Sequence, residues 1–575
     1  MGGVSAVPEL AEWDVAILGS GLAGSTLGAI LARQGFRVLL LESGVHPRFA
    51  VGESVVPEFG ALARILAGLY DLPELARIAN FQELHHHVSA NSGVKRNFSF
   101  VHHRPGQEPT RADWVQFHAM TPPLGPDSHI YRPDLDAWLT ALAIEKGADY
   151  REKTPVDDVL LDPTGVTVVS GARRFRARFV ADASGHGSVL AKKLGLKREP
   201  TLATNSRTLF THMVGVREVA ACVPGGPPLP SPPDQGTLHH YFDGGWFWVI
   251  PFGNHSRARN PVTSVGLTLD RTRHPDTALD PEAEFRHWAE KFPLVQRQLG
   301  GARAVRSWVK TGRLQYQCAP TSGDRWCLLA HSAGFIDALF SSGMSLTFIS
   351  VRDLAAALIP ALRQDDLRRE RFQHLEENAR ENMAMLDKVV HGAFLAMRSG
   401  ALWNAWYRIW AVANFHGSTA LVRLHMQHAA TGQRRFLEQS QEAPWRRSLA
   451  TEQPWVKALI DEGYLHMQAL QRGQRGEAET VDAIFALLAR QDWIPPRFQV
   501  ARREHRHLAP FTVFPLMMTI LWGKRRAPRE VRALLYDVGP VFFWLLTRAL
   551  AREWWRGLLG WLRFARAAHW TRGRM

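Results

Sequence analysis

The chain has 575 residues, of which 46% are hydrophobic and 21% are charged. This composition is ordinary for a folded globular protein, and it excludes a disordered chain, a collagen and a small disulfide-stapled scaffold. Three cysteines in so long a chain favour a reducing compartment. At roughly 150 residues per unit, we expect two to four structural units.

The positive charge is concentrated near the C-terminal end. The formal net charge is +15, and residues 501–575 carry 15 Lys and Arg against four Asp and Glu, together with six tryptophans. Such a segment favours an anionic partner, either a membrane surface or an acidic protein, rather than nucleic acid. No secretion signal and no uncharged run of roughly 20 apolar residues is evident. We therefore expect a cytoplasmic protein, with peripheral membrane contact through the basic region as the further option.

The first elements form a β-α-β pattern. Residues 14–18 are typical of a buried strand, residues 25–35 of a helix with small residues on one face, and residues 37–42 of a second strand. A glycine-rich turn, GSGLAG at 19–24, joins the first strand to the helix. This order within one 30-residue block is the arrangement in which such a turn binds a dinucleotide.

Each glycine of this turn has a separate role. Gly19 makes the tight turn, Gly21 lets the backbone approach a pyrophosphate, and Gly24 lets helix and strand pack closely. The helix N-terminus adds N–H groups and partial positive charge. Glu42, 23 residues after Gly19, stands where a carboxylate binds a ribose hydroxyl. A tight structural turn is the alternative. The predicted nucleotide-binding residues are Gly19, Gly21, Leu22, Ala23, Gly24 and Glu42.

Further along, the pattern alternates before it becomes helical. A helix is expected at 132–147, strands at 179–182, 241–252, 262–269 and 326–330, and another helix from 343. From about residue 365 onward, the pattern is almost wholly helical.

Four separated segments resemble the flavin-dependent halogenases, in the superfamily of flavin monooxygenases and geranylgeranyl reductases. They are 48–54 (RFAVGES), 128–136 (SHIYRPDLD), 182–185 (DASG) and 334–343 (GFIDALFSSG). The resemblance covers about residues 12–360 and implies FAD as the cofactor. The further cofactor-binding residues that it implies are Ser54, Arg132, His331, Gly334 and Asp337.

One position departs from the family pattern. The family usually has Gly-Asp before the last of these segments, and the Asp touches the flavin ribityl chain. Here Ala330 and His331 stand in those places. His331 could donate a hydrogen bond to the ribityl hydroxyls or the phosphate, or it could weaken flavin binding. The residues leave both interpretations open.

Residues 245–251 (GWFWVIP) resemble the W-x-W-x-I-P motif that separates these halogenases from related hydroxylases. The resemblance implies catalytic roles for Trp246 and Trp248. Indoles between flavin and substrate would prevent direct oxygen transfer from a flavin hydroperoxide, whereas a halide would still reach the peroxide and form hypohalous acid. The alternative is a strand with aromatic core residues.

Residues 93–100 (GVKRNFSF) resemble the family's segment that carries the active-site lysine. This assigns to Lys95 the role of holding hypohalous acid beside the substrate. An ammonium would polarise the acid through a hydrogen bond, whereas a neutral amine would form a haloamine, a route that burial makes accessible. Both routes stay open at this point. The alternative is that Lys95 or Arg96 is a solvated charge.

Two further expectations concern substrate and halide. Tryptophan-type halogenases have a carboxylate where this chain has Phe340, and the departure favours the branch acting on phenols, pyrroles or activated carbons, often on carrier proteins. An acidic carrier would suit a basic surface. The halide is expected at the backbone N–H groups of Ser342 and Gly343. The consecutive histidines 85–87 cannot all face one ion on a regular element, so we expect no metal.

Together these features predict an α/β fold: a glutathione-reductase-type FAD-binding domain with an inserted β-sheet substrate domain, followed by a helical C-terminal domain. Residues 1–365 would form the core and 366–575 the helical domain, which either packs on the core or presents an interaction surface. The expected FAD-binding segments are 12–60, 130–200 and 310–365, and the expected substrate-domain segments are 61–129 and 201–309.

The resemblance implies a flavin-dependent halogenase. A separate flavin reductase would supply reduced FAD, and oxygen would convert it to a C4a-hydroperoxide that chloride or bromide attacks. The hypohalous acid would then halogenate an electron-rich carbon of a phenolic, pyrrolic or carrier-tethered substrate. The alternatives are an FAD-dependent hydroxylase or prenyl-chain reductase of the same superfamily, and a non-catalytic flavin-binding adaptor.

Overall fold

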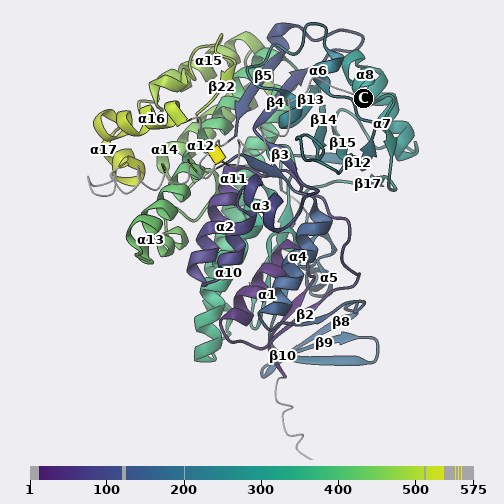
Figure 1. Cartoon of the computed structure of the whole chain (residues 1–575), viewed down its shortest axis with the longest axis vertical. Coiled ribbons are helices and arrows are strands. Elements are labelled where there is room, and N and C mark those ends of the chain that lie inside the picture. The colour runs from purple at the N-terminus through teal and green to yellow at the C-terminus, as the bar shows by residue number, and fades with distance from the viewer. Residues whose placement is uncertain are drawn as a thin grey trace, which may run out of the picture.

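The computed structural model describes residues 12–119, 125–199, 201–510 and 513–536, together with a few single positions beyond them. Most of the basic tail after residue 536 therefore lies outside the described residues. Two halves are stacked along the long axis, each built on its own sheet, and the C-terminal helices lie beside the upper half (Figure 1).

The lower half is built on an eight-stranded sheet that contains the predicted β-α-β unit. Its strands are β1 (Trp13–Leu18), β2 (Val38–Leu41), β7 (Asp149–Arg151), β8 (Asp158–Asp162), β9 (Gly165–Ser170), β10 (Arg173–Asp182), β19 (Ser322–Gly323) and β20 (Trp326–Leu328). β1 lies between β2 and β10 and pairs with both in parallel. Because helices cover it, this centre is apolar throughout its length.

Helices pack on this sheet and carry the cofactor motifs. They are α1 (Leu22–Arg33), α4 (Arg132–Glu145), α5 (Val189–Lys193), α9 (Ala330–Ala333) and α10 (Gly343–Gln364). α1 contacts both α4 and α10, so three segments far apart in the chain meet beside the glycine turn.

The upper half is built on a nine-stranded, mainly antiparallel sheet with the order β16-β12-β15-β14-β13-β4-β5-β22 and β17 beside β12. These strands are β4 (Asn97–His102), β5 (Trp114–His118), β12 (Ser206–Val214), β13 (Thr237–Phe242), β14 (Gly245–Pro251), β15 (Thr263–Asp270), β16 (Arg303–Ala304), β17 (Val309–Lys310) and β22 (His507–Leu508). Alternate residues of β14 face opposite sides, so Trp246 and Trp248 join the large central core while Phe247 and Val249 pack towards α7 (Pro281–Glu290) and α8 (Pro293–Leu299).

Small sheets connect the two halves. β3 (Gly93–Lys95) pairs with β6 (Asp127–His129), and β18 (Tyr316–Cys318) pairs with β11 (Lys197–Arg198) and β21 (Gly334–Phe335). Figure 1 places β3 at the level where the halves meet.

The long C-terminal helices are α11 (Gln373–Ala396), α12 (Gly400–Thr431), α14 (Pro454–Gln471), α15 (Glu477–Ala489) and α16 (Val513–Arg526). Residues 402–418 of α12 are buried all round, as expected of a helix in the centre of a core rather than at a surface. Two features differ from the expected division into FAD-binding, substrate and helical segments. α2 (Pro57–Leu69) packs against α10 and α12, and β22, from the helical region, adds a strand beside β5.

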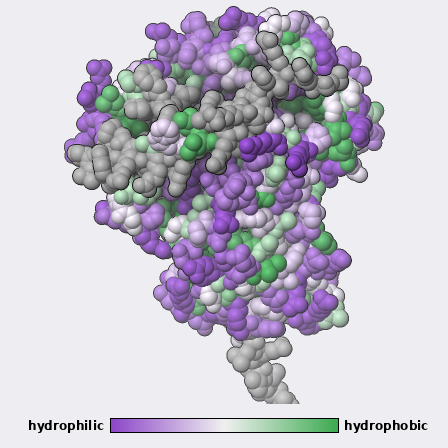
Figure 2. All heavy atoms as spheres, in the orientation of Figure 1, coloured by the Kyte–Doolittle hydropathy of each residue, from purple (hydrophilic) through white to green (hydrophobic). Residues whose placement is uncertain are grey.

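The apolar side chains and the long apolar helix α10 are mostly inside the protein. On the face shown in Figure 2, hydrophilic side chains predominate and apolar ones gather in separated patches. Among the described residues, α10 is long and apolar enough to cross a membrane by length and composition. Since 72% of its most apolar stretch is buried inside the protein, α10 is a core helix.

Candidate active site

The glycine turn has the shape that a pyrophosphate requires. Gly19 has a φ of +96°, and a Cβ on Gly24 would lie 1.9 Å from the Gly19 carbonyl oxygen, so neither position tolerates a side chain. A Cβ on Gly21 would be in ordinary contact with Arg48 Nη2 at 3.6 Å and Asp136 Oδ2 at 3.9 Å, so the backbone here faces the Arg48 guanidinium. The cradle therefore fits the phosphates of FAD.

Glu42 and Arg48 form the charged edge of this cradle. The Glu42 carboxylate accepts hydrogen bonds from the N–H of Ser20 at 3.0 Å and of Gly44 at 2.9 Å, and from Arg48 Nη2 at 3.1 Å. Burial alone would raise the pKa of Glu42, but these donors and the Arg48 charge outweigh it and lower the pKa to about 2. Arg48 lies 3.6 Å from the Cβ position of Gly21, and its buried Nε has no hydrogen-bond partner within the described chain. Arg48 thus fits a phosphate, a role that sequence reasoning did not assign.

Arg132 anchors the segment that carries Ser54. Its guanidinium makes two 2.9 Å hydrogen bonds to Asp136 and donates to the carbonyl oxygens of Val51 at 2.6 Å and Gly52 at 3.2 Å. Through these bonds Arg132 fixes segment 48–54 against α4. Its direct contact with FAD stays a prediction.

The last predicted flavin segment is held by buried polar groups. Burial and the charge of Arg132 lower the pKa of His331 to about 4, so its imidazole is neutral at pH 7. Asp337 accepts hydrogen bonds from Ser206 Oγ at 2.8 Å and the Leu339 N–H at 3.0 Å, and burial raises its pKa to about 6. A Cβ on Gly334 would lie 2.9 Å from the backbone carbonyl oxygen of Tyr316, so this glycine permits the close approach of β21 to β18.

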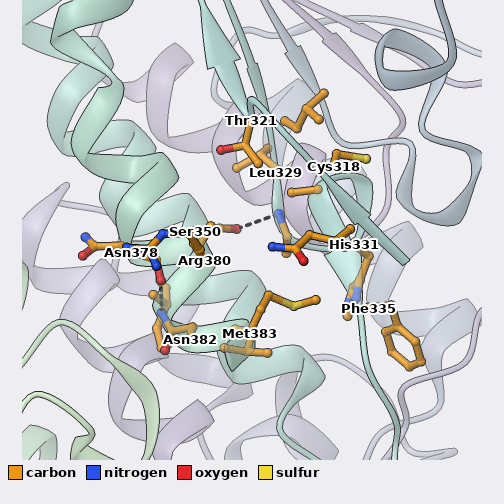
Figure 3. A pocket seen from close by; sticks show the side chains of 18 of the residues that line it. Cys318, Thr321, Leu329, His331, Phe335, Ser350, Asn378, Arg380, Asn382 and Met383 are labelled. Carbon is orange, nitrogen blue, oxygen red and sulfur yellow. Dashed lines mark hydrogen bonds between the residues drawn. The ribbon is translucent and has the colours of Figure 1, made fainter. Parts of the chain in front are cut away.

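A cavity of about 130 Å³ lies beside this segment, between it and helices α10 and α11. Figure 3 shows His331 and Leu329 on one side and Asn378 and Met383 on the other. Ser350 of α10 closes part of the wall by accepting a 3.2 Å hydrogen bond from the backbone N–H of residue 330 (Figure 3).

The expected halide position coincides with the start of α10. No side chain caps this helix, and its first turn contains no acidic residue. The first N–H groups of a helix carry partial positive charge, so Ser342 and Gly343 stand where an anion would be stabilised. The preceding Ser341 places its Oγ 3.1 Å from Ser54 Oγ, which brings this turn next to the partners of Lys95.

Lys95 is fully buried, so the alternative of a solvated charge is wrong for this residue. Its Nζ donates to Ser54 Oγ at 2.7 Å and to the Val55 carbonyl oxygen at 2.6 Å, and it lies 3.4 Å from the centre of the Phe98 ring. Burial lowers the pKa of Lys95 well below its ordinary value, and Asp127 partly opposes this. The three contacts nevertheless match the three donors of an ammonium, because the face of an aromatic ring attracts N–H groups and repels a lone pair.

The titratable neighbours of Lys95 come from two strands, β6 and β13. β3 pairs with β6 so that Lys95 lies opposite Asp127, and His129 follows on the same face of β6. Burial raises the pKa of Asp127 to about 7, although Lys95 opposes the rise. Burial and the Lys95 charge lower the pKa of His129 and of His239, on β13, to about 3 each. Lys95 is therefore surrounded by groups that are weakly charged or neutral.

The two indoles of β14 belong to the same aromatic core. Trp246 and Trp248 lie 5.6 Å apart between ring centres, and Trp246 lies 5.4 Å from His239. Trp248 donates to Ser264 Oγ at 3.2 Å, and its ring occupies the space above Gly266, where a Cβ would approach to 2.1 Å. Gly266 is the cross-strand partner of Trp248, so the glycine makes room for the indole.

α12 supplies an aromatic cover that sequence reasoning missed. Trp410 lies 5.1 Å from Phe98 and stacks on Phe340 at 4.6 Å, and Trp403 lies 5.0 Å from Phe100. The position where the tryptophan-type enzymes have a carboxylate therefore presents a stacked ring. Only the density of aromatic residues in 403–410 could have suggested this contact.

The histidine run 85–87 makes local contacts. The ring of His85 packs against His255 at 5.0 Å, and His87 lies 3.5 Å from Glu83. Within the described ranges, no group of three or more His, Cys, Asp or Glu could hold a metal ion.

Comparison with known proteins agrees with this site. The tryptophan halogenase family model matches residues 118–442, and an NAD(P)-binding Rossmann-like model matches residues 17–77. Monodechloroaminopyrrolnitrin halogenase PrnC of Pseudomonas fluorescens is 38% identical over 92% of this chain and 95% of its own. Tetracycline 7-halogenase of Kitasatospora aureofaciens is 39% identical over 91% and 95%.

A solved structure extends the likeness to three dimensions. Halogenase PltM, in complex with phloroglucinol and FAD, is 32% identical, with a TM-score of 0.83 over 87% of this chain and 100% of its own. The mixed α/β architecture with a Rossmann-like domain is thereby confirmed, and FAD is the cofactor. The chain belongs to the flavin-dependent halogenases and is an FAD-dependent oxidoreductase.

Proposed function

We propose that this halogenase acts on a free phenolic or pyrrolic molecule, using chloride or bromide, oxygen and FAD reduced by a separate flavin reductase. When bound, the FAD supplies the oxygen chemistry that yields hypohalous acid. The observation that carries the proposal is the position of the Lys95 amino group, enclosed by neutral, aromatic walls.

The enclosure favours an uncharged aromatic ring. Phe98, Phe340 and Trp410 offer ring faces and edges, against which an aromatic substrate gains stacking or edge-to-face contacts. His129 and His239 are neutral, so they provide no counter-charge for an ionised substrate. These features support a phenol or a pyrrole rather than a zwitterionic amino acid.

The relatives support a free substrate. The names of the two similar enzymes contain monodechloroaminopyrrolnitrin and tetracycline, and the similar structure contains phloroglucinol. None of these three names contains a carrier protein, whereas two relatives that are 25% and 27% identical are named for a pyrrole carbonyl group on a peptidyl-carrier protein.

Lys95 would hold hypohalous acid against the reacting carbon. The amino group is fixed by Ser54 and Val55, so its remaining N–H points towards the Phe98 ring, and this is the side on which we propose that the oxidant is held. Fixing the oxidant in this way converts a diffusive encounter into an oriented one.

The test supplies FAD, a flavin reductase with its nicotinamide, oxygen and bromide or chloride. A panel of free phenols and pyrroles and a carrier-bound pyrrole acyl group are the substrates, read by mass spectrometry. We expect halogenated product from free compounds. Product from the carrier-bound group alone would contradict the substrate assignment, and hydroxylated product without halide would contradict halogenation.

A further inference from the structure

A chain of buried hydrogen bonds leads from Lys95 to the end of the indole strand. Lys95 Nζ lies 2.7 Å from Ser54 Oγ, and Ser54 Oγ lies 2.7 Å from Thr237 Oγ1. Thr237 Oγ1 lies 2.9 Å from His129 Nε2, and His129 Nδ1 lies 2.9 Å from the carbonyl oxygen of Pro251, the last residue of β14. The four side chains are buried, so no bulk water competes for these bonds.

Chemistry fixes the direction of every bond in this chain. The Pro251 carbonyl can only accept, so His129 carries its proton on Nδ1. The pKa of His129 is lowered to about 3, so the imidazole is neutral and its Nε2 accepts a hydrogen bond. Thr237 must donate to this nitrogen and accept from Ser54. With its proton given to Thr237, Ser54 offers only lone pairs to Lys95 and to Ser341, 3.1 Å away.

We propose that His129 and Thr237 are positioning residues for Lys95, which act by turning the lone pairs of Ser54, rather than its proton, towards the amino group. This inference deepens the proposed function, on which it rests for the role of Lys95. A Ser54 hydroxyl that could turn would withdraw its lone pair from the amino group, and one N–H of Lys95 would lose its fixed acceptor. The directed hydroxyl instead holds one N–H, so the amino group keeps the orientation in which its third N–H faces the Phe98 ring.

Other charges near Lys95 have to be separated from this effect. Asp127 lies opposite Lys95 and changes its charge near neutral pH, Arg64 on α2 acts on Asp127, and His239 faces Lys95 from β13. None of these side chains forms part of the hydrogen-bond chain just described. A substitution at Thr237 leaves all three side chains in place, so its effect on halogenation reports the hydrogen-bond chain.

The test compares Thr237→Val, which removes the hydroxyl at nearly constant shape, with Thr237→Ser, which keeps it. Thr211→Val is the matched control, because Thr211 is equally buried in the same sheet and its hydroxyl donates to the Arg306 carbonyl oxygen. The measurements are the amount of halogenated product formed per reduced FAD reoxidised and the pH profile of that ratio.

We expect Thr237→Val to lower the product ratio about tenfold, the size of one buried hydrogen bond. The limb of the profile that reports Lys95 should also shift to lower pH, because the ammonium loses a fixed acceptor. Thr237→Ser should restore both readouts, and Thr211→Val should change neither. An unchanged ratio and profile in Thr237→Val, or a failure of Thr237→Ser to restore them, would overturn the proposal.

A second readout does not need turnover. In protein with ¹⁵N-labelled histidine, the His129 signals are assigned by their loss in His129→Gln. We expect the Nδ1–H tautomer throughout pH 5–9, because burial keeps the ring neutral and Pro251 holds the proton. The Nε2–H tautomer would overturn the chain even in an inactive preparation. Absence of halogenated product from the wild type would instead contradict the proposed function.

Discussion

The nucleotide end and the Lys95 end of this molecule hold their functional groups by opposite physical means. At the glycine turn, charge is concentrated: Glu42 stays ionised because N–H groups and Arg48 surround it. Around Lys95, charge is suppressed, because burial favours the neutral forms of His129 and Asp127. The first arrangement suits a cofactor with permanent charges, and the second suits a reactive, uncharged oxidant beside an apolar ring.

The largest effect is expected from a negative charge added at the nucleotide end. Gly21→Glu should abolish FAD binding, because an added carboxylate would meet the pyrophosphate and lie near Asp136 Oδ2, 3.9 Å from the Cβ position. An unpaired charge of this kind costs several kcal/mol, which corresponds to at least about 100-fold in affinity. Fluorescence titration of FAD measures it. Gly301→Glu, in open space, is the control, and wild-type affinity in Gly21→Glu would show that the cradle is misassigned.

The second change acts only at the Lys95 end of the molecule. Lys95→Ala should keep FAD binding and flavin reoxidation but lose halogen transfer by about 100-fold or more, because the oxidant is no longer positioned. Lys95→Met preserves the volume of the side chain and should behave alike. Lys95→Arg should also fail, since a guanidinium is larger and stays charged. Stopped-flow spectra and product yield are measured together, and near-normal halogenation by Lys95→Met would remove Lys95 from the reaction.

The third change sharpens the contrast through pH. The pKa of Glu42 is lowered from 4.5 to about 2 on folding, so its contribution to stability is present above pH 4.5 and is lost as pH falls towards 2. At pH 6 this contribution is about 3 kcal/mol. Urea unfolding of Glu42→Gln without FAD should therefore show a deficit relative to wild type that shrinks from pH 6 to pH 3.5. A deficit independent of pH would contradict the assignment.

The smallest effect is expected at Gly266, the glycine that makes room for the Trp248 indole. Gly266→Ala places a methyl group within 2.1 Å of the Trp248 ring, and we expect a loss of about 1–3 kcal/mol in unfolding free energy, as overpacking usually costs. Displacing the indole should also lower the yield of halogenated product per FAD oxidised. Gly312→Ala, with nothing within 4 Å, is the control. Unchanged stability and yield would show that Trp248 does not depend on this glycine.

The same contrast explains what sequence reasoning could predict. The glycine turn and Glu42 lie within one β-α-β unit, so their spacing alone indicates their arrangement. The surroundings of Lys95 come from β6, β13 and α12, whose contacts depend on register and packing over long distances in the chain. The motifs therefore indicated Lys95 and the indoles, whereas the roles of Thr237 and Trp410 required the fold.

Strand β22 has a consequence for how this protein is made. It pairs with β5 through His507 and Leu508, although the two strands are far apart in the chain. A fragment that ends before β22 would leave the hydrogen-bonding edge of β5 open, and exposed edges recruit other chains into aggregates. Contacts between such distant segments also slow folding, because a long loop must close first. The nine-stranded sheet is thus completed only after β22 has been synthesised, so we do not expect the upper half to fold before the helical region is present.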